Sequence, residues 1–204
     1  LPYYITTAIL TKFLTETSKV NKMVVMMQKE VAMRICGKPK TKDYNALSVF
    51  IQYYSNAKIA INVSPNCFYP APDVESSVVL IERKEITNKA LCEESFNNFV
   101  KWIFAQRRKT LMNNISKTSI PKDLAKEKLE SLGFSQTVRS EELSVDDVVN
   151  LFNNIYKEYI KKYNTGVNVE KDLYAACDKE GINWKLENDK LPKAHIDYIN
   201  KKAN

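Results

Sequence analysis

The chain begins with a short segment whose residue types could hold an aromatic base. In Leu1-Pro2-Tyr3-Tyr4, an apolar residue and a proline precede two aromatic residues. Proline fixes its own φ and keeps the preceding residue extended, so this corner exposes a backbone carbonyl beside a flat ring. The carbonyl can accept a hydrogen bond from an exocyclic amine while the ring stacks on the base. Taken alone, however, the segment is better explained by a proline turn before a helix.

A second proline-rich segment, Phe68-Tyr69-Pro70-Ala71-Pro72, lies further along the chain. Two prolines so close together cannot take part in regular strand pairing, and they predict an exposed loop. The simplest interpretation of Phe68 alone is an aromatic side chain that packs onto the core.

Two stretches of the chain are rich in cations. Residues 104–122 contain no acid, and residues 38–42 contain a lysine at every second position. The cations are Arg107, Arg108, Lys109, Lys117 and Lys122 in the first stretch, and Lys38, Lys40 and Lys42 in the second. They suit phosphate contact, with a solvated helix start and a solvated loop as the structural alternatives. The net charge of +7 likewise favours a polyanionic partner such as nucleic acid.

Several classes of site are disfavoured by what the chain contains. His195 is its single histidine, which argues against a Ser-His or Cys-His triad and against a histidine zinc site. The four cysteines are far apart without a Cys-x-x-Cys pair, which predicts reduced thiols and no metal knuckle. No apolar run is long enough to span a membrane, and no signal peptide is present. We expect a cytoplasmic monomer without metal or membrane contact, and the absence of an initial Met predicts a fragment or a processed product.

The first ninety residues have the pattern of an α/β fold. Helices are predicted over 5–14, 30–36 and 44–55, and strands over 22–28, 59–63 and 74–82. Residues 22–28 and 78–81 are near-continuous apolar runs, which are typical of a sheet covered on both faces.

After Glu85 the pattern is helical. Residues 96–104 carry apolar side chains at helical spacing, and a stronger stripe begins at Val148 after the capping box Ser144-Val-Asp-Asp147. Pro121 marks a helix start and Gly133 a helix end. We predict a helical domain over residues 89–163 after an α/β domain over residues 1–88. Residues 164–204 are predicted to be a linker and a tail of unknown role.

Taken in order, five segments resemble the small-subunit (16S) ribosomal RNA adenine-N6,N6-dimethyltransferases, the family associated with kasugamycin resistance. The resemblance covers residues 1 to about 163. Its segments are Leu1–Thr6, Val25–Arg34, Asn45–Tyr54, Phe68–Val79 and Phe104–Asn114. The related large-subunit enzymes of macrolide resistance share the Leu-Pro-Tyr and Phe-x-Pro-x-Pro boxes, but Gln106–Leu111 is similar to the small-subunit branch.

The resemblance implies a fold and a cofactor. The fold would be the C-terminal half of a Rossmann-like class I methyltransferase domain, followed by a small all-helical domain. The complete enzyme would use S-adenosylmethionine, but the Gly-rich cofactor loop and the Asn before Leu1 are not in this chain. Its glycines are only Gly37, Gly133, Gly166 and Gly181. We therefore expect the chain alone not to bind this cofactor, and residues 23–28 to leave a sheet edge without its usual neighbour.

The resemblance also implies roles for individual residues. The backbone carbonyl of Leu1, held by Pro2, would accept a hydrogen bond from the adenine N6 amine. Tyr3 would stack on the flipped base, and Phe68 would close on it. The residues implied to contact RNA are Arg107, Arg108, Lys109, Lys117, Lys38, Lys40 and Lys42.

The expected partner is small-subunit ribosomal RNA or the immature small ribosomal subunit, to whose adenines the complete enzyme would transfer methyl groups. Three alternatives remain open. The chain could be a non-catalytic rRNA-binding or ribosome-assembly module, or an enzyme of the large-subunit type. Its fold could also be a half-sheet with a helical tail that another chain completes.

Overall fold

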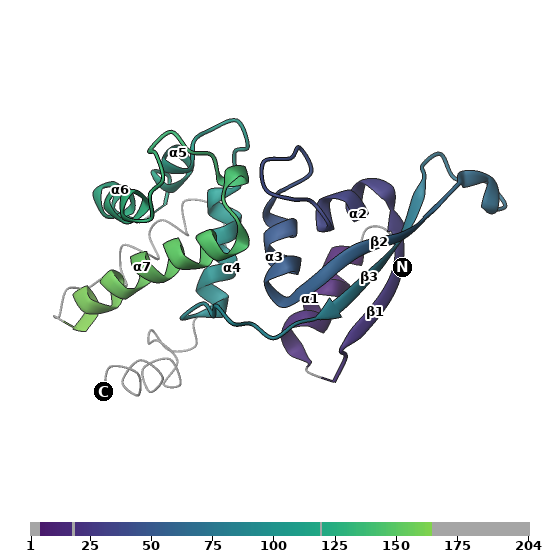
Figure 1. Cartoon of the computed structure of the whole chain (residues 1–204), viewed down its shortest axis with the longest axis horizontal. Helices are drawn as coiled ribbons and strands as arrows, with labels where there is room; N and C mark the ends of the chain where they lie inside the picture. Colours follow the sequence, from purple (N-terminus) through teal and green to yellow (C-terminus); the bar gives the residue numbers. More distant parts are fainter. Residues whose placement is uncertain (1–4, 18, 119, 165–204) are drawn as a thin grey trace. The chain divides into compact units, whose positions relative to one another are not determined.

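The computed structural model describes residues 5–17, 19–118 and 120–164, with side chains as far as Glu158 (Figure 1). The described residues up to Ile160 belong to one compact unit. The first half contains both helices and strands, and helices alone follow. In order, the elements are α1 (Thr6–Glu16), β1 (Lys22–Gln28), α2 (Lys29–Ile35), α3 (Ala46–Tyr54), β2 (Ser55–Val63), η2 (Pro65–Cys67), β3 (Ser76–Arg83), α4 (Glu93–Ile103), α5 (Leu111–Ile115), α6 (Lys122–Ser131), η3 (Ser140–Glu142) and α7 (Val145–Asn164).

The three strands of the described chain form one antiparallel sheet in the order β1-β3-β2. The bounds predicted for the first strand are those of β1, whereas β2 begins at Ser55, four residues before its prediction. A register shift between Ile59 and Ile61 interrupts the pairing of β2 with β3. Because β3 pairs on both sides, it is the central strand, and β1 lies at an edge as predicted.

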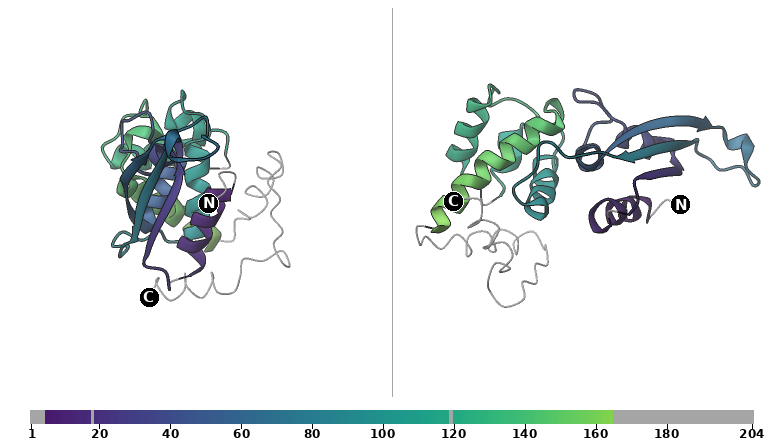
Figure 2. Two further views of the ribbon diagram at one scale, coloured as in Figure 1. Left: turned by 90° about the vertical axis from the view of Figure 1, so that its right-hand side faces the viewer. Right: turned by 60° about the horizontal axis from the view of Figure 1, so that its bottom comes forward.

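One face of the sheet is covered by helices and the other is open. Helix α2 contacts all three strands, while α3 packs on β2 and on α1 (Figures 1 and 2). Met27, Val79 and Ile81 point into this layer and are fully buried. On the opposite face, Val24 is 67% exposed and Ile61 is 61% exposed. The prediction that both faces are covered is therefore wrong for the part of the chain described, because an apolar run does not reveal what packs on its second face.

Two sets of hydrogen bonds stabilise the helices on the covered face. Asn45 and Ser48 form a capping box at the start of α3, which satisfies amide groups that have no partner within the helix. At the end of α1, the guanidinium of Arg83 donates hydrogen bonds to the carbonyls of Phe13, Leu14 and Thr17, and to that of Val20 just beyond. Arg83 therefore ties α1 to the central strand.

The helices after residue 92 bury their apolar stripes against one another. Phe96 and Phe99 on α4 contact Phe152 on α7, with ring centroids 5.5 Å and 5.7 Å apart. The capping box is present, because the amide of Ser144 donates to the Asp147 carboxylate and the amide of Asp147 to the Ser144 hydroxyl. The helix end predicted at Gly133 is also confirmed, since Gly133 follows α6 with φ +81°.

We call the part of the described chain up to Arg83 the sheet region and the part from Glu93 the helical region. Side chains of the two regions contact each other where they meet. The ring of Tyr53 on α3 lies 4.8 Å from that of Phe96 on α4, and its hydroxyl accepts a hydrogen bond from the Ala90 amide. The Tyr54 hydroxyl donates to the Glu93 carboxylate. The division into domains at residue 88 stays a prediction, and the segment predicted over residues 164–204 lies almost wholly outside the described residues.

Candidate RNA-binding surface and base-binding loop

Phe68 lies on the loop that joins β2 to β3, at the far end of the strand pair (Figure 1). The short helix η2 precedes it, with the Ser64 hydroxyl accepting from the Asn66 amide and Pro65 accepting from the Phe68 amide. Phe68 is half-buried, and no ring of the described residues stacks on it. Tyr69 beside it is fully exposed, with a relative exposure of 103%. The predicted exposed loop is confirmed, and it presents two adjacent rings.

The end of this loop is fixed to the start of α2. The Lys29 amide donates to the Glu75 carbonyl at 2.9 Å, and the Lys29 ammonium pairs with the Glu75 carboxylate at 2.6 Å. The Ser77 hydroxyl also donates to the Asn62 side chain at 2.8 Å, which joins the two strands near the loop. A ring on a loop held at both ends has less conformational freedom to lose when it stacks on a base.

Leu1, Pro2 and Tyr3 lie outside the described residues, so their predicted contact with a base stays a prediction. The chain is described from Ile5 onward, and α1 follows directly. Because Arg83 anchors the far end of α1, the first residues of the chain precede a fixed helix.

Lys38, Lys40 and Lys42 lie on an exposed loop between α2 and α3, as predicted. We call residues 38–44 the lysine loop. Lys40 has φ +67°, a left-handed conformation that is uncommon for a residue with a side chain. A Cβ on Gly37 would lie 2.9 Å from backbone atoms of Asp43 and Tyr44, so only glycine fits where the loop closes on itself.

The second group of predicted cations lies between α4 and α5. Arg107, Arg108 and Lys109 are exposed residues of the loop before Thr110, whose hydroxyl caps α5. They are thus not part of a helix start, which was the structural alternative. Arg107 pairs with Glu141 at 2.7 Å, whereas Lys117 beyond α5 is exposed. Arg108, Lys109 and Lys117 have no ion pair with a described residue.

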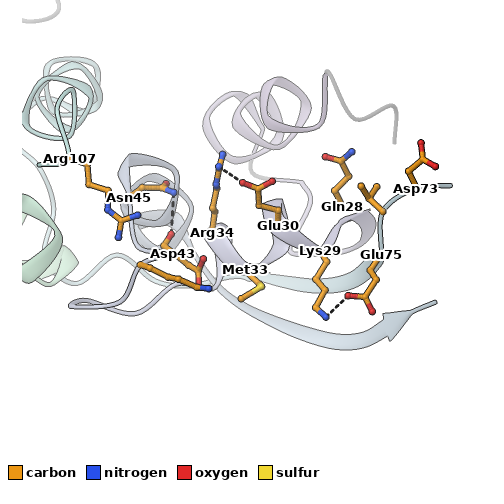
Figure 3. Close-up of a pocket in the computed structure, with 12 residues that line it drawn as sticks. Gln28, Lys29, Glu30, Met33, Arg34, Asp43, Asn45, Asp73, Glu75 and Arg107 are labelled. Carbon is orange, nitrogen blue, oxygen red and sulfur yellow. Dashed lines mark hydrogen bonds and ion pairs between the residues drawn. The ribbon is translucent and has the colours of Figure 1, made fainter. Parts of the chain in front are cut away.

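A groove of about 820 Å³ extends between these parts of the site (Figure 3). One end lies at Asp73 and Glu75, the last part of the loop that carries Phe68, and the other at Arg107 (Figure 3). Acids and cations line it in equal number, and two of the pairs, Lys29–Glu75 and Arg34–Glu30, are closed ion pairs. The groove therefore offers hydrogen-bonding groups to a polar polymer, but it has no strong net electrostatic field.

Sequence reasoning named Lys42 and Arg107 but missed the other polar residues of this groove and the exposed ring of Tyr69. Gln28, Lys29, Arg34 and Glu75 come together only through the tertiary fold, so no local spacing marks them. Tyr69 had a detectable signal, because a residue between an aromatic residue and a proline in an exposed loop has little surface to pack against.

Burial keeps four titratable side chains of the described residues in their protonated form. Burial raises the pKa of the Cys36 thiol above its ordinary value, so it stays protonated near neutral pH. Burial also raises the pKa of Tyr44, Tyr54 and Tyr156 well above the ordinary tyrosine value. The described residues contain no group of three side chains that could hold a metal ion. None of their helices is both long and apolar enough to cross a membrane.

The sequence model of one family, ribosomal RNA adenine dimethylase, matches residues 1–157. The ribosomal RNA small subunit methyltransferase A of Bacillus cytotoxicus is 43% identical over 166 residues, which cover 79% of this chain and 57% of the relative. The protein of the same name from Alkaliphilus oremlandii is 41% identical over 161 residues, which cover 78% and 56%. The chain thus spans little more than half the length of these curated relatives.

Two solved structures share the fold. A dimethyladenosine transferase from Plasmodium falciparum aligns with a TM-score of 0.65 at 23% identity, over 78% of this chain and 66% of that one. The 23S rRNA methyltransferase ErmE aligns with a TM-score of 0.56 at 18% identity, over 76% and 63%. The predicted fold, part of a Rossmann-like methyltransferase domain followed by helices, is confirmed. The chain belongs to the ribosomal RNA adenine dimethylase family.

Proposed function

We propose that this chain is part of an S-adenosylmethionine-dependent rRNA adenine-N6,N6-dimethyltransferase. Its substrate would be adenines in a hairpin of small-subunit ribosomal RNA, and its role would lie in ribosome biogenesis in the cytoplasm. Family membership over residues 1–157 supports the reaction. The structural observation that carries the proposal is the loop between β2 and β3, which carries the half-buried ring of Phe68 and whose last residues, Asp73 to Glu75, line a polar groove.

The chemistry requires positioning more than proton transfer. An adenine N6 amine is a poor nucleophile, since its lone pair is delocalised into the ring. Acceptors on its two hydrogens favour a pyramidal nitrogen, and we assign one of these roles to the backbone carbonyl of Leu1. Tyr3 and Phe68 would hold the flipped base by stacking. Such a mechanism needs no strong general base, because orientation supplies most of the rate.

The family implies S-adenosylmethionine as the methyl donor, but the described residues do not form a site for it. A Gly-rich turn is needed where a backbone approaches such a cofactor. Of the two described glycines, Gly37 packs on the backbone of the lysine loop and Gly133 ends α6. In the family pattern, the cofactor loop precedes the Leu-Pro-Tyr box.

RNA would follow the groove from the Phe68 loop to the cations beside it. Lys38, Lys40 and Lys42 of the lysine loop, with Arg108, Lys109 and Lys117 of the helical region, are exposed and available to phosphates. We propose that these side chains supply the salt-dependent part of RNA affinity.

The proposal is tested by single-turnover methylation of unmodified small-subunit rRNA, with the protein completed by the family's preceding half. Loss of one stacked base contact costs roughly 1–3 kcal/mol, so Phe68→Ala and Tyr3→Ala should each slow methylation about ten- to a hundred-fold. Leu1 should tolerate other apolar residues, since only its carbonyl is used. Cys67→Ser is the matched control on the same loop and should have no effect, because Cys67 is exposed and free. Unchanged rates for both aromatic variants would show that the rings only pack.

A non-catalytic RNA-binding module is the second candidate, favoured by the exposed cations together with the lack of a cofactor site among the described residues. Calorimetry with S-adenosylmethionine and RNA-binding assays separate the two functions. The 204-residue chain should bind rRNA without measurable cofactor binding. If the completed protein also fails to bind the cofactor or to methylate rRNA while still binding it, the module is the correct function.

A further inference from the structure

The lysine loop makes three contacts with residues of the helical region, each of them at least 60 positions further along the chain. The Lys40 amide donates to the Glu141 carbonyl at 2.7 Å. The Arg107 guanidinium donates to the Thr41 carbonyl at 3.4 Å. The ring of Tyr44 meets that of Phe104 edge to face, with centroids 5.9 Å apart. The loop is therefore held by the helical region as well as by its own ends.

Arg107 differs from the cations beside it. Its Nε donates to Oε2 of Glu141 at 2.7 Å, while Nη2 reaches Thr41. A guanidinium is planar and has several donors in fixed directions, so it can join a carboxylate to a carbonyl in a way that an ammonium cannot. Arg108 and Lys109 follow in the same loop but have no ion pair with a described residue. Arg107 is thus committed to protein contacts.

Glu141 is held in a defined position. It lies in η3, and its side chain is largely covered, with a relative exposure of 21%. The neighbouring Ser140 hydroxyl donates to the Ile103 carbonyl at the end of α4. The Glu142 carboxylate accepts from the Arg139 amide at 2.8 Å, which closes the same turn. Glu141 therefore presents a fixed carboxylate and a fixed carbonyl to the two loops.

We propose that Arg107 and Glu141 form a latch that joins the lysine loop to the loop of Arg108 and Lys109. The latch makes one composite phosphate-binding surface from cations of the sheet region and cations of the helical region. Arg107 is a positioning residue of this surface and not one of its phosphate contacts. The inference rests on the proposed RNA binding, and it assigns an acid to a surface that binds a polyanion.

Glu141 could either repel RNA or hold the latch, and the two explanations predict opposite changes in RNA affinity when its charge is removed. If Glu141 only repelled RNA, Glu141→Gln would strengthen RNA binding, because removal of a negative charge favours a polyanion. If Glu141 holds the latch, the same substitution should weaken binding by up to about fivefold, since a partly exposed ion pair contributes up to about that factor to an equilibrium. Glu141→Gln preserves the size of the side chain and all backbone groups.

The experiment compares Glu141→Gln, Arg107→Gln, the double variant and the charge swap Arg107→Glu with Glu141→Arg. Affinity for unmodified small-subunit rRNA is measured over a range of salt concentrations, and hydrogen exchange of the Lys40 amide is measured without RNA. We expect each single variant to weaken binding and to speed exchange at Lys40. The double variant should be no worse than either single variant, and the charge swap should recover part of the affinity.

Arg108→Gln is the matched control. It should lower the salt slope by about one unit, as expected for one lost phosphate contact, and leave Lys40 exchange unchanged. The latch is overturned if Glu141→Gln strengthens RNA binding, or if Arg107→Gln behaves like Arg108→Gln in both measurements. If no form of the protein binds rRNA, the proposed function fails. Lys40 exchange still decides the latch in that case, because unchanged exchange in the two single variants would overturn it.

Discussion

The sheet region and the helical region use their apolar side chains differently. In the helical region, the stripes of α4 and α7 face each other, and Phe96, Val148 and Ile155 are buried. In the sheet region, only one face is covered, and Val24 and Ile61 remain exposed on the other. A helix presents one stripe and needs one partner, whereas a strand presents two faces and needs two. The sheet region therefore depends more on the few contacts that fix its single helical layer.

The largest effect is expected where the two regions meet. Phe96 is fully buried and its ring contacts both Tyr53 and Phe152. Phe96→Ala should lower the free energy of unfolding by about 3–5 kcal/mol, as for other buried aromatic truncations. Urea denaturation measures the change. Val24→Ala on the open face should change stability by less than about 0.5 kcal/mol. Similar losses for the two variants would show that the open face is covered in solution.

A smaller effect is expected at the anchor of α1. Arg83→Ala removes a cation that satisfies four carbonyls, and a hydrogen bond involving a charged group contributes about 1.5–3 kcal/mol. We expect a loss of about 2 kcal/mol, with faster hydrogen exchange in α1 than in α4. Arg83→Lys should recover only part of this stability, because one ammonium cannot reach the same set of acceptors.

If Arg83→Ala speeds exchange equally in α1 and α4, the anchor does not act on α1 alone. The sheet region would then depend less on its local contacts than the comparison with the helical region implies.

Local patterns were sufficient for most elements of both regions. Apolar runs, glycines and capping residues act over a few positions, so β1, the end of α6 at Gly133 and the capping box at Ser144 could be predicted. The open face of the sheet could not, because its exposure depends on elements that no local period encodes.

Local patterns were also insufficient for the candidate site, because its ion pairs join residues that are far apart in the sequence. The cations of residues 38–42 and 107–109 form clusters that are visible in the sequence, but the pairing of Arg107 with Glu141 joins residues 34 positions apart. The pair Lys29–Glu75, which fixes the Phe68 loop, joins residues 46 positions apart. Such pairs come together only when the two regions fold, and the individual residues look like ordinary surface charges in the sequence.

The smallest effect concerns a buried hydroxyl on the lysine loop. Tyr44 is 1% exposed, and its hydroxyl has no hydrogen-bond partner among the described residues. An unsatisfied buried polar group costs about 1–3 kcal/mol, so Tyr44→Phe should stabilise the protein by about 1 kcal/mol at neutral pH. The opposite sign is expected for Tyr54→Phe, because the Tyr54 hydroxyl donates to Glu93. Equal effects of the two substitutions would show that the Tyr44 hydroxyl has found a partner.

Tyr44 also makes the stability of the protein depend on pH in the alkaline range. Burial, with a smaller effect of the Asp147 charge, raises the pKa of Tyr44 in the folded protein above its ordinary value. The folded state therefore retains a proton that the unfolded chain loses above about pH 10, so stability is complete below that pH and falls as pH rises beyond it. Tyr54 and Tyr156 shift in the same direction. Tyr44→Phe removes one of these groups, so denaturation curves between about pH 9 and pH 11 should show a shallower loss of stability than in the unmodified chain. A loss of the same steepness in both proteins would mean that Tyr44 already ionises in the folded state, with its hydroxyl open to water.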